Sequence, residues 1–137
     1  MLQRIQTVYL ALGGTAAAVA LFLRDPIVTT MSADIGWYAP VRMFVALAVA
    51  LTAVIAVFLY GKRAVQQRVT FFSQLLALVL VVLTALGTYL TWPISMRFDF
   101  IVAVSMVLPA ASYILLSLAR RAIVRDINLV KSMDRLR

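Results

Sequence analysis

Residues 69–92 read VTFFSQLLALVLVVLTALGTYLTW, a run of 24 residues without a charged side chain. Arg68 precedes the run and Pro93 follows it. An α-helix rises about 1.5 Å per residue, so this run extends over about 36 Å, enough to cross the hydrocarbon core of a bilayer. The stretch therefore predicts a transmembrane helix.

Three further runs have the same character: residues 5–23, 43–60 and 100–119. The chain of 137 residues is 64% hydrophobic and 13% charged, and its mean hydropathy is +1.01. Soluble domains are roughly 45–50% apolar and about 25% charged, and a soluble fold of this size cannot bury so much apolar surface. We predict an all-α integral membrane protein. It comprises a four-helix transmembrane bundle over residues 1–119 and a cytoplasmic basic amphipathic tail over residues 120–137.

The first run admits a second interpretation. Arg4, the apolar stretch and Ala16-Ala17-Ala18 resemble a secretory signal peptide with its cleavage site. The apolar run is longer than the usual signal core of about 7–15 residues. We therefore expect residues 5–23 to remain as a span.

Basic residues are distributed unequally between the two sides that four spans create. One side holds ten basic and two acidic residues, and the other holds three of each. The ten are Arg4, Lys62, Arg63, Arg68, Arg120, Arg121, Arg125, Lys131, Arg135 and Arg137. Basic residues near span ends favour the cytoplasmic side. This pattern predicts that both termini and the loop over residues 61–68 are cytoplasmic.

The loop over residues 24–42 is the only long connection on the other side. It contains Pro26, Gly36, Trp37 and Pro40, which suit turns and the membrane interface. We expect this loop to cap the bundle, in preference to acting as a lid or docking surface.

Small and polar residues inside the spans form candidate packing or ligand faces. They are Gly13, Gly14, Thr84, Thr88, Ser105, Pro109 and Ser112. Small residues spaced four apart, such as Gly13 and Ala17, allow two helices to approach closely. Pro109 has no N–H for the carbonyl of Ser105, and Ser112 follows on the same face. We favour packing inside the chain's own bundle. A dimer contact at the glycines and a ligand face around the proline are the alternatives.

The tail carries the candidate residues for contact with a partner or with lipid. They are Arg120, Arg121, Arg125, Lys131, Arg135 and Arg137. Apolar residues recur every three or four positions, which is typical of an amphipathic helix continuing from the fourth span: Ala119, Ile123, Ile127, Val130 and Met133. The helix can rest on anionic lipid, dock on a cytosolic partner or touch RNA. Nucleic acid is the least favoured partner, because no aromatic residues are interleaved for base stacking.

The residue inventory excludes several chemistries. The sequence contains no Cys, no His and no Glu. Disulfides, thiol catalysis and thiolate or imidazole metal sites therefore lose their usual groups. No Asp, Glu, Lys, Arg or His lies inside a predicted span, where coupled transporters usually keep one. We expect no catalytic residue, no metal and no cofactor.

The two ends of the chain carry a resemblance to a known family. The opening reads Met1-Leu2-Gln3-Arg4-Ile5-Gln6-Thr7-Val8-Tyr9-Leu10. The close contains Arg121-Ala122-Ile123, Arg125-Asp126, Leu129-Val130-Lys131-Ser132 and Asp134-Arg135-Leu136-Arg137. The chain thereby resembles an uncharacterised family of small four-span membrane proteins of Bacteroidota-type bacteria, domain-of-unknown-function family 4293. It departs from that family's pattern at Ile127-Asn128, where acidic residues are expected. The resemblance implies the four-span fold and a bacterial inner membrane, and it implies no activity.

Elimination leaves two function classes. We expect a non-catalytic accessory or assembly subunit of a larger membrane complex, in contact with membrane lipids and with other subunits or a second copy. The alternative is a small oligomeric carrier or a protein that binds lipid or another apolar ligand.

Overall fold

The computed structural model of the protein describes residues 2–23, 26–95 and 100–134. Those residues contain helices and no strand: α1 (Leu2–Phe22), α2 (Pro26–Asp34), α3 (Tyr38–Phe58), the 3-10 turn η1 (Leu59–Gly61), α4 (Arg63–Ser95) and α5 (Phe100–Asp134). The helices α1, α3, α4 and α5 are each long and apolar enough to cross a membrane. The prediction of an all-α chain with four apolar spans is confirmed.

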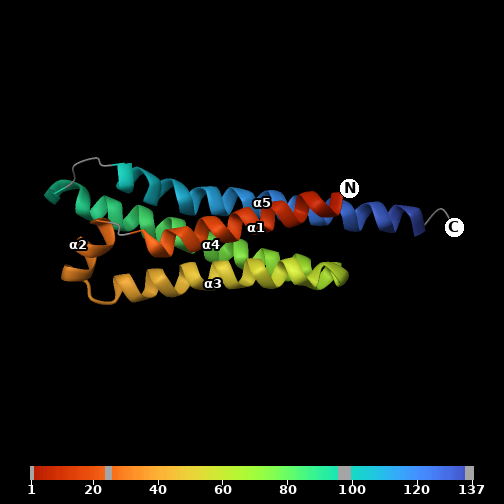
Figure 1. Ribbon diagram of the computed structural model, residues 1–137, viewed down its shortest axis with the longest axis horizontal. Helices are drawn as coiled ribbons and strands as arrows, with labels where there is room; N and C mark the ends of the chain where they lie inside the picture. The colour runs from red at the N-terminus through yellow and green to blue at the C-terminus, as the bar shows by residue number, and fades with distance from the viewer. Residues whose placement is uncertain (1, 24–25, 96–99, 135–137) are drawn as a thin grey trace.

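The four long helices form an antiparallel bundle. Helix α1 contacts α3 and α5, and α4 also contacts α3 and α5, so the helices close a ring in the order α1, α3, α4, α5 (Figure 1). We call the end where α1 begins and α5 ends the terminal end of the bundle; the turn η1 lies there as well (Figure 1). The opposite end, where α2 lies, is the α2 end.

Two of the helices are longer than the apolar runs that predict them. Helix α4 begins at Arg63, before the uncharged run over residues 69–92, and continues two residues past Pro93. Helix α5 runs without a break from Phe100 through Pro109 to Asp134. Residues 120–134 are thus the continuation of the fourth span.

Small side chains dominate the core between the helices. Its buried members include five alanines, contributed by α1, α3, α4 and α5: Ala17, Ala53, Ala56, Ala77 and Ala119. Small residues let helix backbones approach closely, which maximises van der Waals contact where no hydrophobic driving force acts between helices. Leu10, Val49 and Leu116 fill the remaining space.

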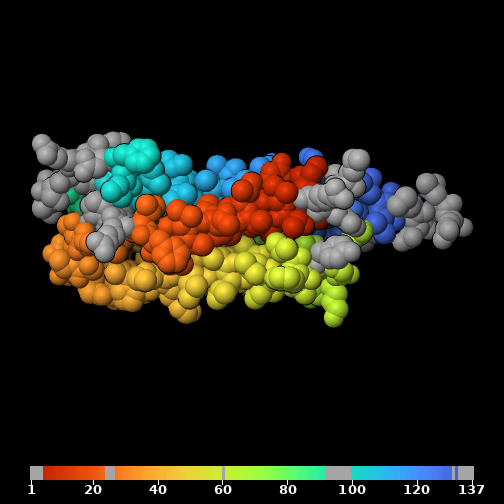
Figure 2. Space-filling view, viewed as in Figure 1, coloured from red at the N-terminus to blue at the C-terminus, as the bar shows by residue number. Residues whose placement is uncertain are grey.

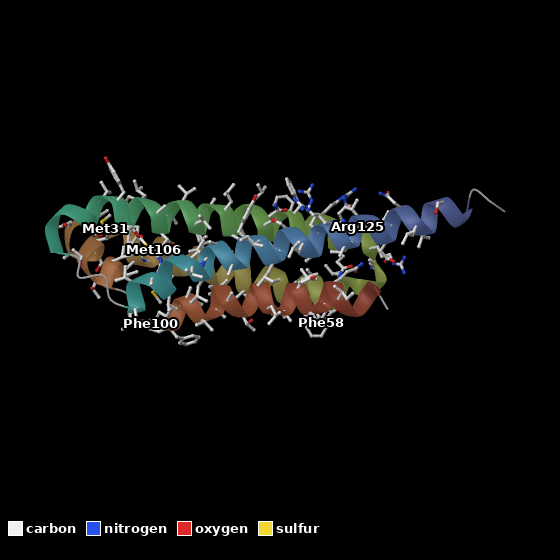
Figure 3. All side chains as sticks on the ribbon, turned by 90° about the horizontal axis from the view of Figure 1, so that it is seen from above. Met31, Phe58, Phe100, Met106 and Arg125 are labelled. Atoms are coloured by element: carbon white, nitrogen blue, oxygen red, sulfur yellow. The ribbon has the colours of Figure 1, made fainter. Side chains whose placement is uncertain are left out.

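The connection after the first span contains a helix where the sequence predicts turns. Ile27 and Met31 of α2 are buried against Tyr38 of α3 and Val102 of α5, and Met106 packs against this cluster (Figure 3). Helix α2 contacts α3, α4 and α5. Helix α2 therefore covers the bundle at the α2 end.

The outward faces of the bundle are strongly apolar. Phe44 and Phe58 of α3 are 72% and 81% exposed, and Phe58 points away from the bundle (Figure 3). Exposed apolar residues recur on all four long helices. A soluble monomer rarely exposes contiguous apolar surface of this extent, whereas a lipid-facing surface requires it.

Candidate functional site

Both glycines of the predicted packing face lie at contacts within the bundle. A Cβ added at Gly14 would stand 3.0 Å from the Cβ of Ala53 and 3.7 Å from the carbonyl oxygen of Ala50, both on α3. A Cβ added at Gly13 would stand 3.1 Å from Cγ of Leu116 on α5. The two positions therefore let α1 approach α3 and α5 of the same chain.

The hydroxyls of the predicted ligand face donate to backbone carbonyls. Thr84 donates to the carbonyl of Leu80 at 2.9 Å, and Thr88 donates to that of Thr84 at 2.8 Å. Ser105 donates to the carbonyl of Val102 at 2.9 Å. Both threonines and Ser105 are buried, so these bonds satisfy them locally.

Ser112 bonds elsewhere than the sequence suggests. Its hydroxyl donates to the carbonyl of Gly13 on α1 at 2.8 Å, which links α5 to α1. The Ser112 hydroxyl thus bonds to α1, and not to the carbonyl of Ser105 that lacks the N–H of Pro109. Pro109 itself is fully buried within the continuous α5.

These bonds predict different responses to removing a hydroxyl. Thr88→Val should lower the free energy of unfolding by less than about 0.5 kcal/mol, because the hydroxyl bonds within its own helix. Ser112→Ala should lower the free energy of unfolding by about 1 kcal/mol, because it removes a hydrogen bond between two helices. Thermal unfolding of the detergent-purified variants measures both. A larger loss in Thr88→Val than in Ser112→Ala would contradict this assignment of the bonds.

Two glutamines and an ion pair link neighbouring helices at the terminal end of the bundle. Gln6 donates to the carbonyl of Ala122 at 3.1 Å and joins α1 to α5. Gln66 donates to the carbonyl of Ala56 at 3.0 Å and joins α4 to α3. Arg63 forms an ion pair with Asp126 at 3.2 Å, which joins α4 to α5. Neither glutamine is assigned a role from the sequence, although a Gln close to the end of an apolar run is a signal for such a bond.

A second polar group lies between α4 and α5, nearer the middle of the bundle. Gln74 donates to the hydroxyl of Ser117 at 3.1 Å and accepts from the guanidinium of Arg120 at 3.4 Å. Ser117 in turn donates to the carbonyl of Tyr113 at 2.8 Å. The Arg120 guanidinium also lies over the ring of Phe71, 4.5 Å from its centroid.

This group lines a cavity of about 620 Å³ on the α4–α5 face, which we call the α4–α5 groove. Its lining residues are Gln74, Tyr113, Ile114, Ser117, Leu118, Arg120, Arg121, Val124 and Arg125. The groove thus brings together three of the six predicted tail residues. Arg120 is half-buried, whereas Arg121 and Arg125 are exposed; Arg125 lies on α5 toward the terminal end (Figure 3).

The rest of the tail extends past the bundle. Helix α5 continues beyond the start of α1 at the terminal end (Figures 1 and 2). Leu129 is 50% exposed and Val130 is 37% exposed, and Asn128 is exposed beside them. We call residues 127–134 the projecting segment. The Lys131 side chain, Arg135 and Arg137 lie outside the described part of the chain.

A family model described as Domain of unknown function (DUF4293) matches residues 2–136. The chain belongs to this family. The match confirms the resemblance suggested by the two ends of the sequence, and it includes the groove and the projecting segment. Comparisons with curated proteins and with solved structures gave no match. The function of this DUF4293 chain is therefore inferred from its own residues.

Proposed function

We propose that this chain is a non-catalytic integral protein of the bacterial inner membrane and serves as an accessory or assembly subunit of a larger membrane complex. The observation that carries the proposal is the projecting segment. A helix that continues without a break out of a membrane bundle and exposes Leu129 and Val130 offers a partner an apolar contact. The segment continues directly from the part of α5 that carries the exposed Arg121 and Arg125.

The polar groups inside the bundle support a structural role for the spans. Thr84, Thr88, Ser105 and Ser112 all donate to backbone carbonyls. In each of these bonds the single hydroxyl proton is already engaged, so none of the four side chains has a proton left to donate to a substrate. The alternative of a small carrier therefore has less support than the subunit role.

The orientation we propose places the terminal end in the cytoplasm. Lys62, Arg68, Arg121 and Arg125 are exposed at that end, and Arg63 lies beside them. Positive charge favours the cytoplasmic side of a span during insertion. A partner of the projecting segment is then a cytoplasmic part of the complex.

Single cysteines test this orientation cleanly, because the natural sequence contains none. We expect Ala33→Cys, exposed on α2, to react with a membrane-impermeant maleimide in spheroplasts. We expect Asn128→Cys to react only after the membrane is permeabilised. Labelling of Asn128→Cys in intact spheroplasts, with Ala33→Cys protected, would invert the proposed orientation.

Affinity purification from native membranes in a mild detergent tests the subunit role. We expect one or more proteins to accompany the chain in constant stoichiometry. A paired substitution in the projecting segment, Leu129→Asp with Val130→Asp, should remove them while the bundle keeps its thermal stability. A homogeneous homo-oligomer without other proteins would instead favour the carrier.

A further inference from the structure

The α4–α5 groove concentrates positive charge without a compensating acid. Three arginines line it, and none of its lining residues is acidic. Asp126, the closest acid along α5, forms its ion pair with Arg63. The groove therefore carries a local excess of positive charge that favours an anion.

One of the three cations is held in place before any ligand binds. Phe71 supports the Arg120 guanidinium from one face, and Gln74 accepts one of its hydrogen bonds. Ser117 orients Gln74 by accepting from its amide nitrogen. A guanidinium has five N–H groups, so Arg120 keeps donors for a second acceptor such as a phosphate oxygen. A preoriented side chain loses less conformational entropy when it binds.

The other two cations complete a multidentate site. Arg121 and Arg125 are four residues apart on α5, so they lie one above the other on the same helix face. Both are exposed and can turn toward an anion in the groove. Arginine suits phosphate because its planar donors match two oxygens at once.

The walls of the groove change from polar to apolar along α5. Arg120 directly follows the uncharged run over residues 100–119, which places the cations at the level of lipid headgroups. Leu118 and Ile114 line the groove about one and two turns deeper, and both are exposed on the lipid-facing side. An acyl chain can follow these residues while the phosphate stays at the arginines.

We propose that the α4–α5 groove is a binding site for an anionic phospholipid. The phosphate of its headgroup is held by Arg120, Arg121 and Arg125, and its acyl chains lie along Leu118 and Ile114. The inference rests on the proposed membrane location and narrows general lipid contact to a single groove. A soluble phosphate would satisfy the arginines but would leave the apolar wall unused.

Native mass spectrometry of the detergent-purified full chain tests the site. Phosphatidylglycerol and phosphatidylcholine with identical acyl chains serve as the anionic and zwitterionic probes. We expect the unaltered chain to bind phosphatidylglycerol about tenfold more tightly than phosphatidylcholine, because both lipids carry the phosphate but the choline ammonium of phosphatidylcholine is repelled by the three arginines. Arg121→Gln with Arg125→Gln should reduce that preference to about twofold or less.

A charge-matched variant separates the groove from general surface charge. Lys62→Gln with Arg68→Gln removes two exposed charges at the same end and leaves the lining of the groove intact. This variant should keep the tenfold preference. Gln74→Leu should weaken phosphatidylglycerol binding several-fold, because it releases Arg120. Thermal unfolding without added lipid verifies that each variant is folded.

Three results would overturn the proposal. The first is an equal loss of lipid preference in the groove variant and in its charge-matched control. The second is no preference for phosphatidylglycerol in the unaltered chain. The third is displacement of phosphatidylglycerol by millimolar inorganic phosphate, which would reassign the site to a soluble anion. The experiment uses the isolated chain, so its outcome is independent of whether a partner subunit is found.

Discussion

Gly87→Leu is expected to have the largest effect of the substitutions proposed for this chain, a destabilisation of the bundle by about 3 kcal/mol. A Cβ at this position would stand 2.8 Å from Cζ of Tyr38 and 2.9 Å from Cγ2 of Ile27. Tyr38 and Ile27 are essentially inaccessible, at 1% and 0% exposure, so neither can move aside into solvent or lipid. The Tyr38 hydroxyl also donates to the carbonyl of Leu83 at 2.9 Å, which fixes the ring beside the glycine.

Thermal unfolding in detergent measures this effect, and Ala85→Leu is its control. Ala85 is exposed on the same helix, so a leucine there should change the unfolding midpoint little. The unfolding midpoint of Gly87→Ala should lie between those of Gly87→Leu and Ala85→Leu, because alanine adds only a methyl group at position 87. Equal midpoints for Gly87→Leu and Ala85→Leu would show that α2 and α3 do not pack on α4 as described.

Gly14→Leu is expected to have the second largest effect, about 2–3 kcal/mol. The added side chain would meet Ala53 at its Cβ and the backbone carbonyl of Ala50 behind it. A backbone cannot rotate away as a side chain can, so α1 and α3 must separate. Their separation would also strain the contacts of Gly13 with α5.

Ala11→Leu is the matched control for that substitution. Ala11 is exposed on α1, and the residue change is similar in size. Measuring oligomeric state beside stability distinguishes the two interpretations of the glycines. Loss of stability in Gly14→Leu at unchanged oligomeric state supports packing within one chain. Dissociation of an oligomer into stable monomers would instead assign the glycines to a contact between copies.

The spans could be predicted from sequence because bilayer thickness imposes a length on every uncharged run. The run over residues 69–92 illustrates both the strength and the limit of that rule. It lies wholly within α4, yet α4 itself begins at Arg63 and ends at Ser95. A charged residue ends the uncharged run that can lie in the hydrocarbon core, but the helix itself continues past it. Hydropathy therefore predicts where a span lies and leaves helix ends undetermined.

Contacts between distant residues could not be predicted in the same way. Gly87 looks like an ordinary glycine in an apolar run, and only the fold brings Tyr38 against it. Arg42 flanks the second predicted span, yet it is buried at the α2 end. The loop over residues 24–42 is predicted to contain turns because of Pro26, Gly36, Trp37 and Pro40, yet residues 26–34 form α2. The burial of Ile27 and Met31 against other helices stabilises α2, and sequence spacing does not reveal that contact.

The candidate site was partly visible in the sequence. The arginines of the tail were recognisable from charge asymmetry alone. Gln74, Ser117 and Phe71 were not connected with them, because sequence spacing does not reveal which faces of α4 and α5 meet. The pairing of Gln74 with Ser117 and Arg120 supplies that relation and defines the groove.

Photocrosslinking in native membranes tests the proposed subunit role most directly. A photoreactive amino acid at Leu129 reports on the projecting segment, and one at the lipid-facing Phe44 serves as control. The subunit role predicts that position 129 yields one discrete protein adduct, which position 44 does not. Adducts with lipid alone or with a second copy of the chain at position 129 would contradict the subunit role.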